Sequence, residues 1–196
     1  MFIDALRSNQ ATFDLELPEE TLARLEEYYS LLTRWNDRLH LVAPCSPEEF
    51  AVRHVLESLL LLPHLPPNSK IADIGSGGGL PIIPCLIVRP DLDVTLIESS
   101  QKKAVFLREA LNRLGLHAGV IAKPFEEIPA PPVSFVTCRA LDHFMQKLPA
   151  LIDWGPRKLL LFGGETLGAQ LNKIGVTFEQ ILIPQSEKRY LFVTPD

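Results

Sequence analysis

The run 73–80 (DIGSGGGL) combines an aspartate with four glycines, residue types that suit close contact with a ligand. Glycines let the backbone turn sharply and approach a ligand without interference from Cβ atoms. The D-x-G-x-G-x-G order differs from the GxGxxG of loops that hold a dinucleotide pyrophosphate. A carboxylate just before the loop favours a cationic amino-acid group over a pyrophosphate. We therefore predict ligand contacts, rather than a mere tight turn, at Asp73, Gly75, Ser76, Gly77, Gly79 and Leu80.

Glu98 follows the next apolar run, 94–97 (VTLI), where a predicted strand ends. An acidic side chain at this position can accept hydrogen bonds from both ribose hydroxyls of a nucleoside, and its charge disfavours a 2′-phosphate. NAD shares this requirement, so Glu98 alone does not distinguish the cofactors. A ligand with both a cationic amino-acid group and a nucleoside is S-adenosylmethionine. An NAD-dependent oxidoreductase is the alternative, which Asp73 and the glycine spacing disfavour.

Three further residues lie near the ends of later predicted strands, at the sheet edge where open α/β folds bind ligands. Phe125 and Glu126 could pack on and hydrogen-bond an adenine, or be a core residue and a solvated carboxylate. Arg139 could face an RNA phosphate, a guanine or the cofactor, or be a surface arginine. We include all three in the predicted site.

Two charged segments remain open to more than one interpretation. In the run 53–58 (RHVLES), Arg53 and Glu57 are four residues apart and share one face of a helix. That face borders the active site, or it carries a solvated Arg53–Glu57 ion pair. Lys102, followed by Lys103, makes the start of another helix basic, as a phosphate contact or a solvated surface.

These residues need a scaffold that changes character along the chain. Apolar residues at spacings of three and four predict helices over 18–39 and from a cap at Ser46 to about Leu62, ended by prolines. Short apolar runs then alternate with helical stretches, which is typical of βα units and a mostly parallel sheet. We predict strands over 71–74, 94–97, 118–122, 134–137, 158–162, 178–183 and 189–193, and helices over 80–88, 101–114, about 142–152 and 165–174.

The predicted fold class is therefore α/β, with a helical cap subdomain over 1–66 and a Rossmann-like domain over 67–196. The last two of about seven strands should form an antiparallel hairpin, because their connection is short. A seven-stranded sheet of this kind is the arrangement of class I methyltransferases, an analogy of fold only.

Composition limits the classes of function. The formal charge is −5, which argues against a general nucleic-acid binder. The acidity lies in residues 1–60, which hold 5 basic and 11 acidic side chains, against 14 and 13 in residues 61–196. No apolar run approaches the roughly 20 residues of a membrane helix, and the first residues do not read as a secretory signal. We expect a cytoplasmic protein whose three separated cysteines are reduced and hold no metal.

Together these motifs resemble the RsmG (GidB) family of bacterial 16S ribosomal RNA methyltransferases, which modify guanine N7. The resemblance covers nearly the whole chain. It is carried by the runs 28–36 (YYSLLTRWN), 53–59 (RHVLESL), 73–84 (DIGSGGGLPIIP), 96–99 (LIES), 102–103 (KK), 106–108 (FLR), 138–140 (CRA) and 188–191 (KRYL).

The resemblance implies S-adenosylmethionine as cofactor, no metal, and 16S rRNA or the 30S subunit as partner of a monomer. It implies cofactor contacts at Gly75, Leu80, Glu98, Phe125, Glu126 and Arg139, and RNA-side or catalytic roles for Lys102, Arg139 and Arg189.

The chain departs from the family pattern at three places. Ile82 stands where the family has glycine and is expected to crowd the loop. The run 123–126 (KPFE) replaces the family's G-R-A-E, so its arginine is lost at Pro124 or replaced by Lys123. Phe162 stands where the family has a lysine, and each lost cation is expected to weaken RNA contact.

Guanine N7 carries a free lone pair, so its methylation needs positioning and electrostatics rather than a dedicated base. Arg139 would orient the guanine or its phosphate. A catalytically inert cofactor-binding module and a methyltransferase with another RNA target are the alternatives.

Overall fold

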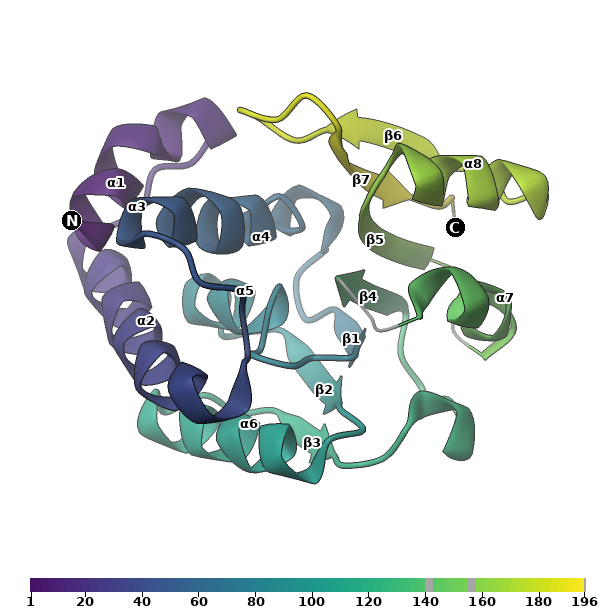
Figure 1. Cartoon of the computed structure of the whole chain (residues 1–196), viewed down its shortest axis with the longest axis horizontal. Coiled ribbons are helices and arrows are strands. Elements are labelled where there is room, and N and C mark those ends of the chain that lie inside the picture. Colours follow the sequence, from purple (N-terminus) through teal and green to yellow (C-terminus); the bar gives the residue numbers. More distant parts are fainter. Residues whose placement is uncertain (140–142, 155–157, 196) are drawn as a thin grey trace.

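A mixed sheet with strand order β3-β2-β1-β4-β5-β7-β6 forms the centre of the computed structural model, which describes residues 1–139, 143–154 and 158–195 (Figure 1). Neighbouring strands from β1 to β5 are parallel, whereas β7 is antiparallel to both β5 and β6. The predicted hairpin is therefore present. The strands in the described part of the chain are Lys70–Ile74 (β1), Asp93–Ile97 (β2), Gly119–Ile121 (β3), Phe135–Arg139 (β4), Lys158–Gly164 (β5), Glu179–Leu182 (β6) and Arg189–Val193 (β7).

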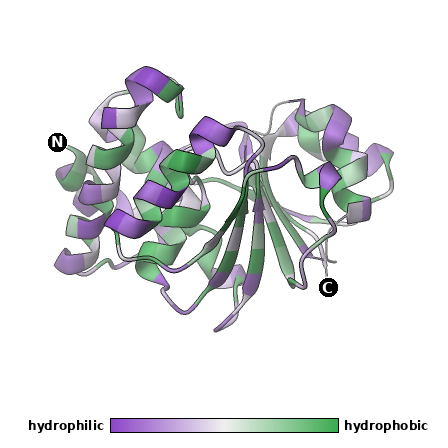
Figure 2. Ribbon diagram, turned by 90° about the horizontal axis from the view of Figure 1, so that it is seen from below, coloured by the Kyte–Doolittle hydropathy of each residue, from purple (hydrophilic) through white to green (hydrophobic). Residues whose placement is uncertain are grey.

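Helices cover both faces of this sheet, which Figure 2 shows nearly edge-on between two layers of helices. The N-terminal helices lie on the same side as α5 and α6, while α7 and α8 lie on the other. The α-helices are Phe2–Asn9 (α1), Glu19–Leu39 (α2), Pro47–Phe50 (α3), Glu57–Leu59 (α4), Ile82–Val88 (α5), Gln101–Arg113 (α6), Phe144–Trp154 (α7) and Glu165–Lys173 (α8).

Alternation along the strands supplies a core to each layer, because successive strand residues point to opposite faces. Ile71 and Leu160 belong to the core on the α5 side, whereas Ala72 and Leu161 belong to the core under α7 and α8. The confirmed α/β fold thus brings the carboxyl ends of β1, β2 and β4 to one edge, where the loops that follow them meet.

The N-terminal helices share one core with the sheet. Leu25 and Tyr28 of α2 are fully buried in the same cluster as Ile83 of α5 and Phe106 of α6. The first third of the chain is helical as predicted, and the subdomain boundary at residue 66 stays a prediction.

Helix α1 and a π-helical segment are among the elements that the sequence patterns did not predict. Helix α1 precedes the predicted helices, and its Phe2 stacks on Tyr29 with ring centroids 4.5 Å apart. The helix predicted from Ser46 contains a π-helical segment, Ala51–Leu56 (η2), between α3 and α4. The predicted start of the helix at 142 lies outside the described residues, and α7 begins at Phe144.

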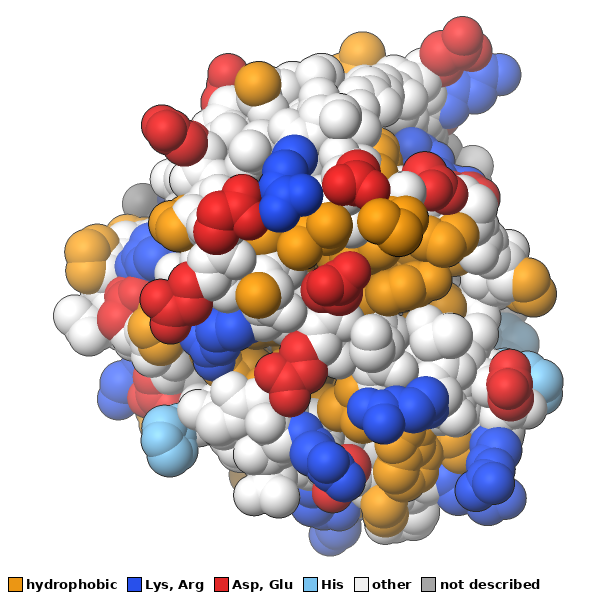
Figure 3. All heavy atoms as spheres, turned by 90° about the vertical axis from the view of Figure 1, so that its left-hand side faces the viewer, with side chains coloured by type: hydrophobic (Ala, Val, Ile, Leu, Met, Phe, Trp, Pro, Cys, Tyr) orange, Lys and Arg blue, Asp and Glu red, His pale blue; other side chains and the backbone are white. Residues whose placement is uncertain are grey.

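Charges of both signs are interspersed on the face formed by the N-terminal helices, with Lys and Arg more frequent toward its lower edge (Figure 3). Arg34 and Arg38 of α2 and Arg113 of α6 line a groove around Trp35. Within the described residues, every helix is too short or too polar to cross a bilayer.

Candidate active site

The glycine loop connects β1 to α5 and depends on three left-handed glycines. Gly75, Gly77 and Gly79 have φ angles of 69°, 51° and 85°, a region that favours glycine. A Cβ atom at Gly79 would lie 2.3 Å from Cδ1 of Ile83, which is buried. The loop is also held from β2, because Gly75 N donates to Ile97 O over 2.8 Å. These residues therefore fix the curved backbone that the sequence predicts.

A cavity of about 350 Å³ opens beside this loop, within the size range of small-molecule sites. Six of the predicted cofactor residues line it: Gly75, Ser76, Gly77, Leu80, Glu98 and Arg139. The segment 41–43, His54, Gly78, Ser99, Lys103 and Lys147 complete its wall. Phe125 and Glu126 instead line a small neighbouring cleft that shares Gly75, Ser99 and Lys147 with the cavity.

Asp73 lies beneath the loop and is fully buried, and it is not among the residues that line the cavity. Its Oδ1 accepts a hydrogen bond from Thr137 Oγ1 over 2.6 Å, while Oδ2 has no partner among the described residues. Burial raises the pKa of Asp73 from 3.8 to about 7, although hydrogen bonds from Thr137 and Ser76 oppose this. A buried carboxylate with a free oxygen favours a nearby cation.

Glu98 joins the loop to the start of α6. Its Oε2 accepts from Gly77 N over 2.8 Å, and its Oε1 accepts from Ser100 N over 2.7 Å. The side chain is only 6% exposed and lines the cavity. Each carboxylate oxygen can accept a further hydrogen bond, so Glu98 can bind ribose hydroxyls while it holds the loop.

Glu98→Ala is expected to weaken S-adenosylmethionine binding at least about tenfold. A charge-assisted hydrogen bond contributes roughly 1.5–3 kcal/mol, and a tenfold change is about 1.4 kcal/mol. The affinity is measured by calorimetric titration. Asp93→Ala, at the exposed opposite end of β2, is the matched control and should bind normally. A loss below about twofold for Glu98→Ala would remove Glu98 from the site.

Two predicted arginines meet at a buried carboxylate. Arg139 ends β4 and Arg189 begins β7, and their Nη2 atoms donate to Glu57 Oε2 and Oε1 over 3.1 and 2.6 Å. The Glu57 side chain is 1% exposed. Burial raises the pKa of Glu57 against the effect of both guanidiniums. Burial beside these cations also lowers the pKa of His54 to about 3, so His54 is neutral there.

These contacts correct one expectation. Arg53 and Glu57 do not form an ion pair with each other: Arg53 pairs with Glu49, one turn earlier, and Glu57 pairs with Arg139 and Arg189. Arg139 is therefore not a bland surface residue. Lys102 is exposed and is absent from the residues that line the cavity, whereas its neighbour Lys103 lines it.

A second cavity, also of about 350 Å³, shares Arg139 with the first. Its wall combines apolar side chains, Phe144, Met145, Phe162, Leu167 and Ile183, with Glu57, Arg139, Arg189, Thr166 and two glycines. The Arg139 guanidinium lies 5.4 Å from the Phe162 ring centroid, within the range of a cation–π contact. Phe162 thus supports Arg139 through its ring.

The remaining predicted residues have packing roles that the patterns left open. Phe125 is buried and its ring meets Trp154 edge-on, with centroids 5.6 Å apart. Glu126 pairs with Lys147 of α7 over 3.0 Å. Ile82 is fully buried in the core of the α5 side and is absent from the cavity lining, so it does not crowd the cofactor cavity.

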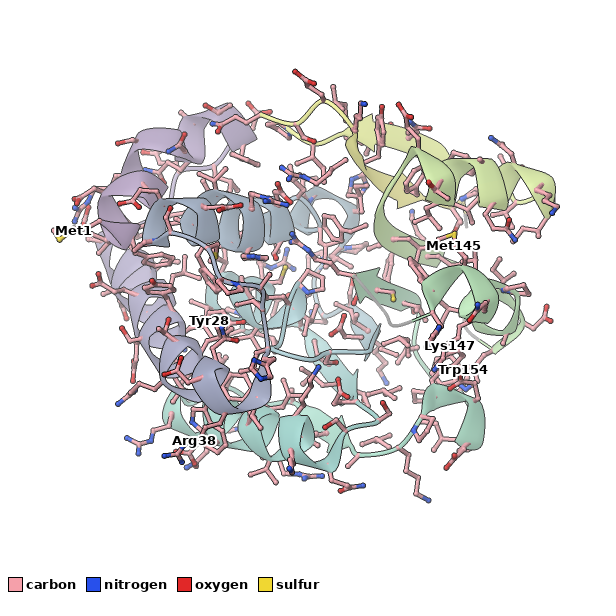
Figure 4. The ribbon with its side chains drawn as sticks, in the orientation of Figure 1. Met1, Tyr28, Arg38, Met145, Lys147 and Trp154 are labelled. Carbon is pink, nitrogen blue, oxygen red and sulfur yellow. The ribbon has the colours of Figure 1, made fainter. Side chains whose placement is uncertain are left out.

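The site also uses residues that the sequence patterns did not single out. The buried Tyr28 of α2 donates to Gly78 O over 2.6 Å, and Lys147 of α7 lines the cavity from the other side of the sheet (Figure 4). Residues 41–43, after α2, close it from the N-terminal side. These contacts join segments far apart in sequence, and no local pattern signals them.

Comparison with known proteins places the chain in a family. The family described as rRNA small subunit methyltransferase G (GidB) matches residues 21–167. Ribosomal RNA small subunit methyltransferase G of Chromobacterium violaceum is 38% identical over 143 residues, 72% of this chain and 68% of that protein. The protein of the same name from Xanthomonas axonopodis pv. citri is 45% identical over 122 residues, 61% of this chain and 57% of its own length.

Solved structures support the same fold at low identity. Magnesium protoporphyrin IX methyltransferase from Synechocystis, solved with bound S-adenosylmethionine, has a TM-score of 0.62 at 14% identity, covering 92% of this chain and 99% of its own. A SAM-dependent methyltransferase from Aquifex aeolicus has a TM-score of 0.58 at 16% identity, covering 85% and 98%. At these identities the likeness concerns the fold alone.

The family match confirms the resemblance, and with it the prediction of an S-adenosylmethionine-dependent methyltransferase rather than an NAD-dependent oxidoreductase. Among the described residues, no group of three His, Cys, Asp or Glu could hold a metal ion. The chain that carries this glycine loop, Glu98 and the paired arginines is thus a member of the GidB family of rRNA small subunit methyltransferases.

Proposed function

We propose that this chain methylates N7 of a guanine in 16S rRNA of the small ribosomal subunit, acting in the cytoplasm as a monomer. One observation carries the proposal: Arg139 lines both the loop-walled cavity and the apolar, aromatic one. A cofactor in one cavity and a base in the other would meet at this arginine.

The first cavity fits S-adenosylmethionine by the chemistry of its wall. Glu98 offers acceptors for the ribose hydroxyls, and the glycine loop leaves room for close backbone approach. Asp73, with a free Oδ2 beneath the loop, favours the cationic groups of this cofactor. When bound, the cofactor supplies an electrophilic methyl group.

The second cavity suits a purine base. Bases extruded from RNA stack on aromatic side chains and Arg planes, and Phe144, Phe162 and Arg139 line this cavity. Arg139 and Arg189 both line this cavity, in agreement with the RNA-side or catalytic roles that the family resemblance implies for them.

Arg139 would act by orientation. Its donors can hold the guanine O6 or a phosphate oxygen, and N7 must stay free of hydrogen bonds because its lone pair forms the new bond. N7 bears no proton in guanine, so no residue of the site needs to remove one. Positioning of the base by the arginines then supplies the rate acceleration.

The test is methyl transfer to purified 30S subunits that lack the modification. We expect label from [methyl-³H]S-adenosylmethionine to enter 16S rRNA and to appear as 7-methylguanosine after nuclease digestion and mass spectrometry. Naked 16S rRNA in parallel shows whether the assembled subunit is required, and 50S subunits are the negative control.

Two results would contradict the proposal. Label in another nucleoside or in 50S rRNA would indicate a methyltransferase with a different target. Absence of label, together with normal binding of S-adenosylhomocysteine by calorimetry, would favour an inert binding module.

A further inference from the structure

Glu57 is a buried carboxylate that contacts two arginines from distant strands. It begins α4, directly after the π-helical segment η2. In that segment Glu57 N donates to Val52 O rather than to Arg53 O, as the wider turn requires. Arg139 Nη2 donates to Arg53 O over 2.5 Å and also to Glu57 Oε2. The irregular helix therefore presents a carbonyl and a carboxylate to the same guanidinium.

The two arginines keep donors that the described residues do not use. Arg139 Nη1 and Arg189 Nε are buried and have no hydrogen-bond partner among the described residues. Buried donors of this kind are costly unless a ligand or water accepts from them. Glu57 neutralises one of the two positive charges, so the group of three retains one positive charge beside the second cavity.

We propose that Glu57 is a positioning residue: it holds Arg139 and Arg189 side by side so that their free N–H groups serve an acceptor oxygen of the RNA substrate. This inference rests on the proposed function and adds to it a residue of the N-terminal helices. Each arginine is attached to a different strand, and the Glu57 carboxylate is what joins them. Without it the two guanidiniums would repel each other.

The opposite role is chemically possible, in which the carboxylate occupies the arginines and an RNA oxygen must displace it. The two roles predict opposite signs. A positioning residue lowers kcat when it is removed, whereas a competing carboxylate raises activity when it is removed.

The first experiment measures Glu57→Gln, which keeps the side chain's shape and removes its charge. We expect kcat on 30S subunits to fall about tenfold or more, because the two arginines lose the carboxylate that holds them together. The affinity for S-adenosylmethionine should stay within about twofold of wild type, because the walls of the cofactor cavity are unchanged. Glu109→Gln, which breaks an exposed Glu–Arg pair on α6, is the matched control and should keep normal kcat.

A double variant separates action through the arginine from loss of fold. Arg189→Met with Glu57→Gln should lose less kcat than the two single variants combined, because Glu57 acts partly through Arg189 and partly through Arg139. It also removes both charges of the pair, which keeps the comparison available if Glu57→Gln alone does not fold. Equal kcat for wild type and Glu57→Gln, a rise in activity, or fully additive losses would each overturn the proposal.

A readout that does not need methyl transfer keeps this inference apart from the proposed function. In ¹⁵N–¹H spectra of arginine side chains, we expect slow guanidinium rotation for Arg139 and Arg189 in the wild type and averaged signals in Glu57→Gln. Such spectra with a wild type that does not methylate 30S subunits would refute the proposed function but support positioning by Glu57. Unchanged arginine spectra in Glu57→Gln would refute the positioning role.

Discussion

Arg139→Lys is expected to lower kcat for methylation of 30S subunits on the order of a hundredfold, the scale of loss when a reacting group is misplaced by about 1 Å. Lysine keeps the charge but lacks the planar guanidinium, whose Nη2 donates to both Glu57 and Arg53 O while Nη1 remains as a second donor. It also loses stacking of the guanidinium on Phe162. The rate is measured at saturating S-adenosylmethionine.

The cofactor affinity of the same variant assigns the role of Arg139. An affinity within about twofold of wild type indicates orientation of the base or phosphate, whereas a parallel loss indicates contact with the cofactor. Arg113→Lys, at an exposed ion pair on α6, should retain normal kcat. Full activity in Arg139→Lys would contradict both roles.

The free energy of unfolding of the ligand-free protein is expected to fall by about 2 kcal/mol between pH 5.5 and 7.5 through Asp73 alone. Burial raises the pKa of Asp73 from 3.8 to about 7. Between pH 3.8 and about 7, Asp73 keeps its proton in the folded state and loses it in the unfolded state. Stability from this group is therefore complete below pH 3.8 and declines as the pH rises to 7.

Asp73→Asn isolates this effect, because an amide cannot ionise. Denaturant unfolding at pH 5.5 and 7.5 should give a pH difference smaller for Asp73→Asn than for wild type by about 2 kcal/mol. Asp91→Asn is the control: Arg89 holds the pKa of Asp91 below its usual range, so this residue stays ionised throughout the window. If the free energy of unfolding changes equally with pH in wild type and Asp73→Asn, the pKa of Asp73 is not raised in the folded state.

The parts of the site that depend on one segment were predictable from sequence. The glycine loop is a local solution to a strand that turns into a helix, and Gly75, Gly77 and Gly79 all have the positive φ angles that explain their type. Glu98 was predictable because it ends a strand adjacent to that loop. The strand pattern followed from apolar alternation, and the antiparallel hairpin β6–β7 from its short connection.

The parts that depend on tertiary packing were not predictable. Spacing of four suggested a pair of Arg53 with Glu57, but spacing does not show which side chain is buried. Glu57 is 1% exposed and faces strands more than eighty residues away, whereas Arg53 remains at the surface with Glu49. Helix α1 was missed because its apolar residues Phe2, Ala5 and Leu6 form too short a pattern to identify.

The buried hydroxyl of Tyr28 donates to Gly78 O and so connects the N-terminal helices, which share a core with the sheet, directly to the glycine loop. The glycine loop is clamped from outside its own βα unit, by a helix that is synthesised before any strand exists. A displacement of α2 would weaken the hydrogen bond to Gly78 O and increase the backbone mobility of the glycine loop. This would happen even though α2 contributes no residue to the cavity lining. Substitutions in α2 would therefore change ligand binding indirectly, through the conformation of the glycine loop.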